Sequence, residues 1–396
     1  MMKFKIKDKC NICKKIFFTY NSIDLPGLPI TEIFLRSPNY KKKILFDQKI
    51  NYCQSCHHMQ LQNQYDTSYF YNKDYLTSST NSYSGRYTND IFYEFIKSNI
   101  DQNKKYNILE IGANDLYLIK KMKKFIRSSC TIDPCIKPDS RLKKIKYIKK
   151  FLENTSINEI DFIPDIVVCS HTLEHIEDPK KFIKMLTSFG DDKTKYFFQF
   201  PSCESLLDRR AFDQIHHQHF NFFSINSISK LLKKIKFDVK EYDIGELHYG
   251  SLMIYFKKSK DNIKSINPNV QKFNGKLSDI YYDYKMYMKN LIQIIKKYQK
   301  RGSKVYGIGA GLMLPLVNYH LNDLLKDFDG ILDDDKNKLN KFYPNLSTKI
   351  SSLKKADLSN AVAVICSTAS SVTTRKLVEV CRLNNAKIII IPSMTI

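Results

Sequence analysis

The chain has 396 residues, of which 43% are hydrophobic, and it carries a formal net charge of +24 at neutral pH. This length is enough for two or three domains, and the mean hydropathy of −0.38 argues against a membrane protein. No apolar stretch is long enough to cross a bilayer. The charged start "MMKFKIKDKCNICKK" lacks the apolar core of a secretory signal, so we expect a cytoplasmic protein.

The positive charge is compatible with an acidic partner, such as nucleic acid, a membrane surface or a phosphorylated substrate. Lysine supplies nearly all of the excess, and the lysines are spread along the chain rather than gathered into one stripe. This distribution favours a solvated basic surface over a nucleic-acid footprint. We therefore expect a small-molecule substrate, no nucleic-acid partner and no membrane insertion.

Two Cys-x-x-Cys pairs lie near the start of the chain. They supply Cys10, Cys13, Cys53 and Cys56. In a reducing compartment such pairs indicate metal binding, and four thiolates form a closed tetrahedral zinc site, so a structural role is predicted. Two unrelated reduced pairs are the alternative. His57 or His58 could also replace a cysteine as ligand, although four cysteines already complete the set.

The next segments alternate between helical and strand patterns. Residues 90–100 predict an amphipathic helix, and "YNILEIGANDLYLIKKMKKF" predicts a buried strand, a glycine turn and a helix. "SCTIDP" and "PDIVVCSHTLEHI" predict a second and a third strand, and "KYFFQFPS" and "GSLMIYFKK" predict later ones. Strands that alternate with helices indicate an α/β fold with a parallel sheet covered by helices.

The first glycine turn, "EIGAND", is a candidate cofactor site. The turn has a single glycine, Gly112, where a dinucleotide fingerprint would have three. Glu110 precedes the turn and Asp133 ends the next strand, where it can accept hydrogen bonds from a ribose diol. These acids favour S-adenosylmethionine over NAD, and a purely structural turn is the alternative. The predicted cofactor residues are Glu110, Gly112, Asn114, Asp133, Ser170 and His171.

A second alternation follows a lysine-rich stretch. Residues 261–300 have apolar residues at helical spacing and predict a long helix that connects two lobes. "KVYGIGAGLMLPLV" then predicts strand, glycine turn and helix, and "DFDGILDDD" predicts a strand that ends in acids. "AVAVICS", "TTRKLVEVCRLNN" and "KIIIIPS" complete a second Rossmann-like unit.

Three histidines are crowded into "FDQIHHQHFNFFS". Histidine titrates near neutral pH, so His216, His217 and His219 could supply a base, an acid or metal ligands. If the segment were extended, His217 and His219 would share a face, and if it were helical they would diverge. A polar, capped helix start and a metal chelate by His217 and His219 are the alternatives to a base.

Many pieces occur here in the order of one known family. They are the paired Cys-x-x-Cys with "DLPGLPITEIF" between them, "DYLTSST", "ILEIGANDLYLIKK", "SHTLEHIEDPKKF", "FDQIHHQHFNFFS", "HYGSLMIYF" and "VYGIGAGLMLPLVNY". With these pieces the chain resembles the three-domain, zinc-containing sugar C-methyltransferases, which methylate nucleotide-linked 4-keto-deoxysugars. The resemblance covers almost the whole chain.

This resemblance implies roles for the histidine segment. The last histidine of the family motif is the base, which here is His219. His216 stands where the family has tyrosine, and Gln218 where it has glutamate. A glutamine or a cationic imidazole can donate to the enolate oxygen that forms when a C–H next to a ketone is removed. Tyr75 matches a family tyrosine beside the site, and Thr77 replaces a second one.

The resemblance also implies a substrate site. His248, Gly250 and Ser251 match a family stretch near the sugar, with Tyr249 in place of a glycine. In the C-terminal unit, Gly307, Gly309 and Gly311 could hold a diphosphate, and the family's version is not thought to use NAD. We expect this unit to bind the nucleotide-linked sugar, and we take Gly309 as the representative residue of that site.

Three domains follow from these features. We expect a zinc-binding domain at residues 1–68, a Rossmann-like methyltransferase domain at 69–260, and a connecting helix with a C-terminal Rossmann-like substrate domain at 261–396. The predicted function is S-adenosylmethionine-dependent C-methylation of a nucleotide-linked keto-deoxysugar by a monomer or weak homodimer. An O- or N-methyltransferase on a sugar, or a zinc-containing RNA-binding protein, are the alternatives.

Overall fold

The structure is a computed structural model. It describes residues 4–38, 44–66, 83–136, 138–245, 250–259, 273, 275–368 and 370–394. Four residues that the sequence analysis named lie outside the described residues: Tyr75, Thr77, His248 and Tyr249. Within the described part of the chain, no helix is both long and apolar enough to cross a membrane.

A seven-stranded sheet forms the core of the central lobe. Its strand order is β12-β13-β10-β9-β6-β7-β8, and only β12 and β13 pair antiparallel to their neighbours. The elements of this lobe are α1 Tyr83–Ser98, β6 Tyr106–Ile111, α2 Tyr117–Lys121, β7 Ile126–Ile132, β8 Ile145–Ile148, β9 Ile166–Ser170, α3 Pro179–Thr187, β10 Lys195–Pro201, α4 Cys203–Asp208, α5 Ile225–Lys233, β12 Phe237–Ile244 and β13 Ser251–Lys258. The expected helix at 90–100 lies within α1 except for its last residues, and the expected strands are confirmed.

The order of these strands reverses at β6, and we call the carboxyl edge of the sheet at this reversal the crevice. β6 leads through β7 to β8 on one side, whereas the chain returns to β9 and β10 on the other side of β6. In open α/β sheets, ligands bind beyond the carboxyl ends of the strands at such a reversal. The crevice therefore lies where β6 and β9 end, and the candidate cofactor residues follow these strands and β7.

The N-terminal region forms a second sheet that recruits a strand from the central lobe. Its strands are β2 Ser22–Pro29, β3 Leu45–Cys53, β4 His58–Leu61 and β11 Asn221–Phe222, and a separate pair consists of β1 Phe4–Ile6 and β5 Asn63–Tyr65. β11 lies near the end of the histidine segment and pairs with β4. The sheet thus holds one end of that segment in place.

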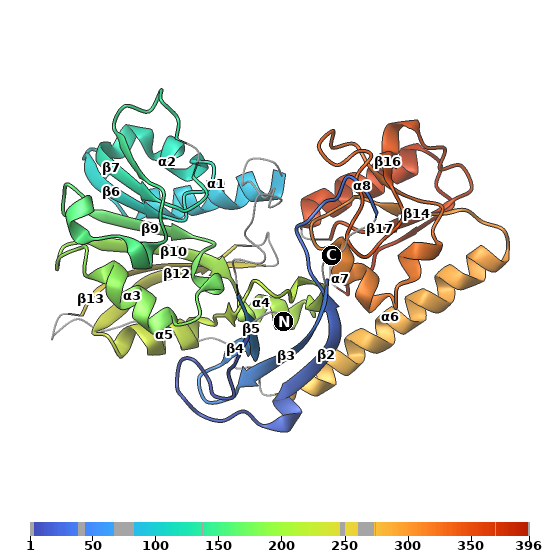
Figure 1. The fold of residues 1–396 in the computed structure, drawn as a ribbon, viewed down its shortest axis with the longest axis horizontal. Coiled ribbons are helices and arrows are strands. Elements are labelled where there is room, and N and C mark those ends of the chain that lie inside the picture. Colours follow the sequence, from blue (N-terminus) through green and yellow to red (C-terminus); the bar gives the residue numbers. More distant parts are fainter. Residues whose placement is uncertain are drawn as a thin grey trace.

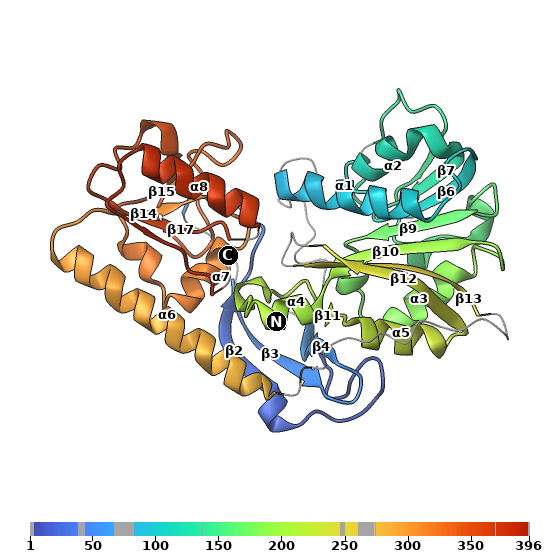
Figure 2. The ribbon, with the colours of Figure 1, turned by 180° about the vertical axis from the view of Figure 1, so that it is seen from behind.

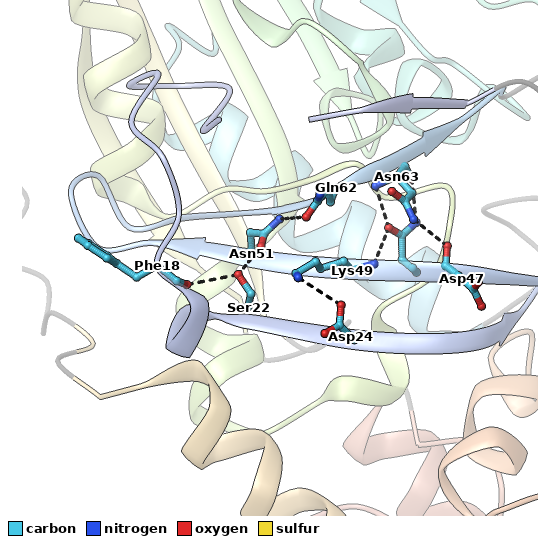
Figure 3. Close-up of polar contacts among 9 residues, drawn as sticks. Phe18, Ser22, Asp24, Asp47, Lys49, Asn51, Gln62 and Asn63 are labelled. Atoms are coloured by element: carbon cyan, nitrogen blue, oxygen red, sulfur yellow. Dashed lines mark hydrogen bonds and ion pairs between the residues drawn. The ribbon is translucent and has the colours of Figure 1, made fainter. Parts of the chain in front are cut away.

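Polar side chains connect the strands of this sheet (Figure 3). The Ser22 hydroxyl donates to Asn51, whose amide nitrogen donates to Gln62 at 3.2 Å. Lys49 forms an ion pair with Asp24, 3.3 Å apart. These contacts lie along β2 and β3 and fix the register of the strands that carry the second cysteine pair.

The C-terminal lobe has a five-stranded parallel sheet of order β16-β15-β14-β17-β18. Its elements are β14 Val305–Ile308, α7 Leu314–His320, β15 Gly330–Asp333, β16 Ile350–Ser352, β17 Val362–Ile365, α8 Ser371–Leu383 and β18 Ile388–Ile390. The order reverses between β14 and β17, as in a Rossmann-like sheet. The expected strand–turn–helix pattern of this region is therefore present.

One long helix joins the N-terminal sheet to the C-terminal lobe. The predicted connecting helix over 261–300 is confirmed as α6 Leu277–Lys300, and residues 261–272 and 274 lie outside the described residues. It runs from the N-terminal sheet along the flank of the C-terminal lobe, while the methyltransferase lobe lies on the other side (Figures 1 and 2). Its buried side chains belong to one continuous apolar cluster with residues of β2, β3, β14 and β17. The N-terminal sheet and the C-terminal lobe therefore share a core.

Candidate active site

The glycine turn after β6 lies against the loop after β9. Gly112 has a φ of +74°, and a Cβ at this position would lie 2.0 Å from the Thr172 hydroxyl oxygen. No side chain fits in that space, so glycine allows the two loops to approach each other. Its amide donates to the carbonyl of Ile132 at the end of β7. The turn is thereby fixed at the carboxyl edge of β6, β7 and β9.

Asp133 ties this turn to the second strand. One carboxylate oxygen accepts from the amide of Asn114 at 2.9 Å, and the other accepts from the amide of Cys135 at 2.6 Å. Burial raises the pKa of Asp133. Each carboxylate oxygen has two lone pairs, so both can also accept from a ligand's hydroxyl groups. The arrangement fits a ribose.

Glu110 sits deeper in the same edge. It is 3% exposed, and its Oε2 has no hydrogen-bond partner among the described residues. Burial, together with the neighbouring Asp133 and Asp115, raises the pKa of Glu110 to about 8. A buried acceptor without a donor is expensive, so a ligand donor would stabilise it. This orphaned oxygen and the close-packed glycine turn make the crevice fit S-adenosylmethionine.

Ser170 and His171 follow β9 at the same edge. The Ser170 hydroxyl donates to the side-chain oxygen of Gln199 at 3.2 Å, and the backbone of His171 has a φ of +47°. The Nδ1 atom of His171 lies 3.1 Å from a carboxylate oxygen of Glu174. The structure therefore brings all six predicted cofactor residues to one edge of the sheet.

Within the histidine segment, residues 216–219 form a turn, neither a strand nor a helix. The amide of His219 donates to the carbonyl of His216 at 3.2 Å, so these two residues close the turn. Their ring centroids are 3.9 Å apart. His217 lies in the middle of the turn, and its side chain points away from these two rings. The turn thus separates histidines that the sequence could not distinguish.

His217 belongs to the core of the N-terminal region. Its Nε2 donates to the carbonyl of Leu28 at 2.9 Å, and its Nδ1 accepts from the amide of Gln48 at 3.4 Å. It is fully buried, with ring-edge contacts to Phe46 and Tyr65, and burial lowers its pKa to about 4. A metal chelate by His217 and His219 is therefore wrong, because both nitrogens of His217 are engaged away from His219.

His216 and Gln218 are paired with each other. The Nδ1 of His216 donates to Oε1 of Gln218 at 2.8 Å. Burial lowers the pKa of His216 to about 3, so the imidazole is neutral near neutral pH and its Nε2 carries a lone pair. The structure does not favour the cationic His216 that the sequence analysis considered, because burial disfavours the charged form.

Two residues that the sequence analysis did not name as site residues join this group. Glu174 and His175 lie in a short 3₁₀ helix after β9. The Nδ1 of His175 donates to the carbonyl of Gln218 at 2.9 Å, and its ring centroid is 4.7 Å from that of His219. The sequence could have indicated these two residues by their position directly after the third strand, since the carboxyl ends of parallel strands share one edge.

Glu174, His175 and His219 could also hold a divalent metal. One ligand atom of each lies within 4.8 Å of the others, and the side chain of Glu174 is buried. A histidine whose Nδ1 donates to a backbone carbonyl presents Nε2 as a lone pair, which suits a metal ligand and a proton acceptor equally. The group therefore combines a carboxylate with two imidazoles next to the crevice.

Gly250 and Ser251 lie at the same edge, where β13 starts beside the end of β10. Gly250 has a φ of +87°, and a Cβ there would lie 2.1 Å from the Ser205 hydroxyl oxygen. Ser251 pairs with Pro201, and its buried hydroxyl has no hydrogen-bond partner among the described residues. A substrate hydroxyl could complete this group.

The C-terminal lobe contains a glycine turn similar to the one at the predicted cofactor site. Gly309 has a φ of +87° after β14, and a Cβ would lie 2.9 Å from the Cβ of Ser367. The carboxylate of Asp333 accepts from the amides of Ala310 and Asp335 at 2.8 and 2.7 Å. This glycine turn therefore lies beside the loop that follows β17, as the first lies beside the loop that follows β9.

The same loop reaches the histidine segment. Thr368 donates to the buried carboxylate of Asp213 at 2.9 Å, three residues before His216. Helices α1 and α8 also contact each other across the two lobes, as Figure 2 shows. The glycine turn of the C-terminal lobe and the histidine turn are thus connected through one loop.

The four predicted zinc ligands form one cluster. Their sulfur atoms all lie within 4.8 Å of one another, and the Cys10–Cys56 and Cys13–Cys53 sulfur distances are both 3.4 Å. In a tetrahedral site with Zn–S bonds of about 2.3 Å, the sulfur atoms lie about 3.8 Å apart. The donor set and spacing fit zinc.

Two family models match this chain. Residues 86–242 match the one described as "Methyltransferase domain". Residues 10–71, which include all four cysteines, match the one described as "Putative zinc binding domain". The chain therefore combines an S-adenosylmethionine-dependent methyltransferase domain with a zinc-binding N-terminal region, and its cofactors are S-adenosylmethionine and zinc.

A curated relative shares a short stretch with this chain. It is the C-methyltransferase NovU of Streptomyces niveus, 26% identical over 81 residues. The stretch covers 20% of this chain and 19% of NovU, so the chain spans about a fifth of the length of the curated relative it matches.

Solved methyltransferase structures resemble less than half of this chain. The magnesium protoporphyrin IX methyltransferase ChlM of Synechocystis PCC 6803, with bound SAM, is 14% identical, with a TM-score of 0.34 over 44% of this chain and 80% of that chain. The N-methyltransferase NodS of Bradyrhizobium japonicum WM9 is 14% identical, with a TM-score of 0.35 over 45% and 89%. Likeness at this level indicates no substrate.

Proposed function

We propose that this enzyme transfers the methyl group of S-adenosylmethionine to a carbon next to the ketone of a nucleotide-linked sugar. The observation that carries the proposal is the turn that sets His219 beside His216 and His175 at the carboxyl edge of the methyltransferase sheet. A general base is therefore available next to the predicted cofactor. The short match to NovU, a C-methyltransferase by name, supports this choice of reaction.

The chemistry assigns one step to His219. Its imidazole takes the proton from the carbon next to the ketone, and the electron pair of that C–H bond forms the enolate. S-adenosylmethionine supplies an electrophilic methyl group on a sulfonium. The second N–H of the Gln218 amide is a candidate donor to the enolate oxygen, because the N–H of neutral His216 is already bonded to Gln218. Tyr75, outside the described residues, is proposed as a further catalytic residue on the family resemblance alone.

The nucleotide of the substrate is proposed to bind to the C-terminal lobe. Gly309 provides a turn at the carboxyl edge of that sheet, and the Thr368–Asp213 hydrogen bond connects the neighbouring loop to the histidine segment. His248, Gly250 and Ser251 are proposed sugar-binding residues. The buried hydroxyl of Ser251 has no hydrogen-bond partner among the described residues, which supports the assignment of Ser251.

The test is the incubation of enzyme, S-adenosylmethionine and a panel of nucleotide-linked sugars, followed by mass spectrometry. We expect one added methyl group on a keto sugar and none on the matching sugar in which the ketone is reduced to a hydroxyl. Methylation of the hydroxyl sugar as well would favour an O-methyltransferase. Salt-sensitive binding of RNA, with no sugar methylated, would favour the RNA-binding alternative.

A further inference from the structure

Glu32 lies in an unusual place for a carboxylate. It follows β2 in the segment "LPITEIF" and has a φ of +67°, a left-handed conformation that is strained for a residue with a Cβ. Its side chain is half-buried, and its amide donates to the carbonyl of Leu312 in the C-terminal lobe at 3.5 Å. Strain of this kind persists where the surroundings hold it, and it gathers at functional sites.

The carboxylate of Glu32 faces the histidine turn. Its Oε2 accepts from the Nε2 of Gln218 at 3.5 Å. The other end of the Gln218 amide, Oε1, accepts from the Nδ1 of His216 at 2.8 Å and from the Thr31 hydroxyl at 3.4 Å. Hydrogen bonds therefore run in one direction, from His216 to Gln218 to Glu32.

The direction of this chain follows from Glu32. An ionised carboxylate can only accept, so it selects the nitrogen end of the Gln218 amide. The oxygen end then faces His216 and requires the proton on Nδ1. His216 consequently presents the lone pair of Nε2, within a ring 3.9 Å from that of His219. Without the carboxylate, the amide could turn over and the proton of His216 could move to the other nitrogen.

We propose that Glu32 is a positioning residue of the active site, which acts through Gln218 to hold His216 in its Nδ1–H form beside the base. This inference rests on the proposed function, because His219 is the base only there. Glu32 also places a negative charge at the end of the chain, where it favours the transient imidazolium that forms when His219 takes a proton. Burial raises the pKa of Glu32 to about 7, so the carboxylate is ionised and fixes the direction of the chain above that pH, where the test is made.

The test compares the single variant Glu32→Gln with an exchanged pair, in which Glu32→Gln is combined with Gln218→Glu. Glu32→Gln keeps the shape of the side chain, but the amide at position 32 can then present either its oxygen or its nitrogen to Gln218. The Gln218 amide can therefore turn over as well. We expect a mixture of His216 tautomers, measured by NMR of the nitrogen-15-labelled histidines without substrate. In turnover, kcat should fall by about 10- to 100-fold, as for the loss of an outer partner, while the KM for the sugar stays unchanged.

The exchanged pair should reverse the effect on the tautomer. The carboxylate introduced at position 218 would accept directly from Nδ1 of His216, while the amide introduced at position 32 donates to that carboxylate, so the Nδ1–H form returns. Turnover should stay low, because position 218 no longer has an N–H for the enolate oxygen. Asp24→Asn is the matched control, because this carboxylate lies on the same sheet but is exposed and pairs with Lys49. If Glu32→Gln is unstable, Gln218→Leu interrupts the chain from the other side and should give the same mixture.

An unchanged His216 tautomer in Glu32→Gln or in Gln218→Leu would overturn the proposal. Unchanged kcat in Glu32→Gln, or a mixture of His216 tautomers in the exchanged pair, would also overturn it. The NMR measurement needs no substrate, so it tests the role of Glu32 separately from the proposed methylation of a keto sugar. A tautomer change in an enzyme that methylates no keto sugar would refute the proposed function and leave the hydrogen-bond chain intact.

Discussion

At the scale of single residues, the turn at 216–219 gives neighbouring histidines opposite roles. His217 donates and accepts inside the N-terminal core, whereas His219 lies beside the crevice with His175 and His216. A sequence cannot reveal this, because spacing fixes side-chain direction only in regular elements. The motif order indicated His219, and the turn supplies a geometric reason for preferring it over His217.

The two histidines should therefore respond differently to substitution. His219→Ala should keep the fold and the affinity for S-adenosylmethionine but lose roughly 10²–10⁴ in turnover, as expected for the loss of a general base. His217→Ala should lose far less turnover per folded molecule but should be less stable, because it leaves two buried partners unsatisfied. Steady-state kinetics and thermal unfolding of both variants check this. Equal loss of turnover in both would contradict the separation.

Glu110 should make stability depend on pH. Its pKa is raised from its usual value near 4.5 to about 8, so the folded protein binds more protons than the unfolded chain between these pH values. By linkage, this group lowers the free energy of unfolding as pH rises through that window. Glu110→Gln should therefore be more stable than the parent at pH 8, by about 1–3 kcal/mol at about 1.4 kcal/mol per unit of pKa.

The same substitution should weaken S-adenosylmethionine binding above pH 8, where Glu110 is ionised, since an amide accepts fewer hydrogen bonds than a carboxylate. Denaturant unfolding at pH 5 and pH 8, with calorimetry of the cofactor, measures both effects. A variant that is less stable than the parent at pH 8 would show that the buried oxygen is already satisfied.

At the scale of elements, the cysteine pairs hold the strands next to the histidine turn. The second pair ends β3 and precedes β4, and β4 pairs with β11. We predict about one zinc per chain, with all four cysteines as ligands. Cys53→Ser should lose zinc and stability, and it should also lower turnover through β11. Cys135→Ser, at an exposed cysteine, is the control.

Metal analysis and thermal unfolding of these variants test the prediction. Zinc that stays at one per chain in Cys53→Ser would remove this cysteine from the ligand set. Because structural zinc contributes directly to folding, a chelator should lower the unfolding temperature of the parent and leave that of a zinc-free Cys53→Ser unchanged.

Local patterns predicted most of the elements, and tertiary contacts supplied the rest of the site. "YNILEIGAND" and "VYGIGAG" carry strand, turn and helix signals within a few residues, so both glycine turns could be predicted. The contact of Glu32 with Gln218 joins positions 186 residues apart, and β11 adds to a sheet that begins near residue 22. No local pattern encodes such pairs. Their geometry is set by how the lobes pack.

At the scale of the whole molecule, α6 packs into an apolar cluster shared by the N-terminal sheet and the C-terminal lobe, so we expect these parts to unfold as one cooperative unit. Met288 is 1% exposed on this helix and belongs to the shared apolar cluster. Met288→Ala should cost about 2–5 kcal/mol, as for other buried large-to-small changes. Met286→Ala, on the exposed side of the same helix, should change stability by no more than about 0.5 kcal/mol.

Denaturant unfolding followed by circular dichroism and by tyrosine fluorescence measures both variants. The chain has no tryptophan, so tyrosine is the available fluorophore. We expect Met288→Ala to shift the transition of the N-terminal region and of the C-terminal lobe together. Two separate transitions, of which only one moves, would show that these parts unfold independently.

The central claim is that His219 removes a proton from the carbon next to the ketone of a nucleotide-linked sugar. The most direct measurement is the exchange of that hydrogen with solvent deuterium, in enzyme and sugar without methyl transfer. The parent enzyme should incorporate deuterium at this carbon, and His219→Ala should do so slower by roughly 10²–10⁴. Incorporation by His219→Ala at the parent's rate would show that another group removes the proton and would contradict the claim.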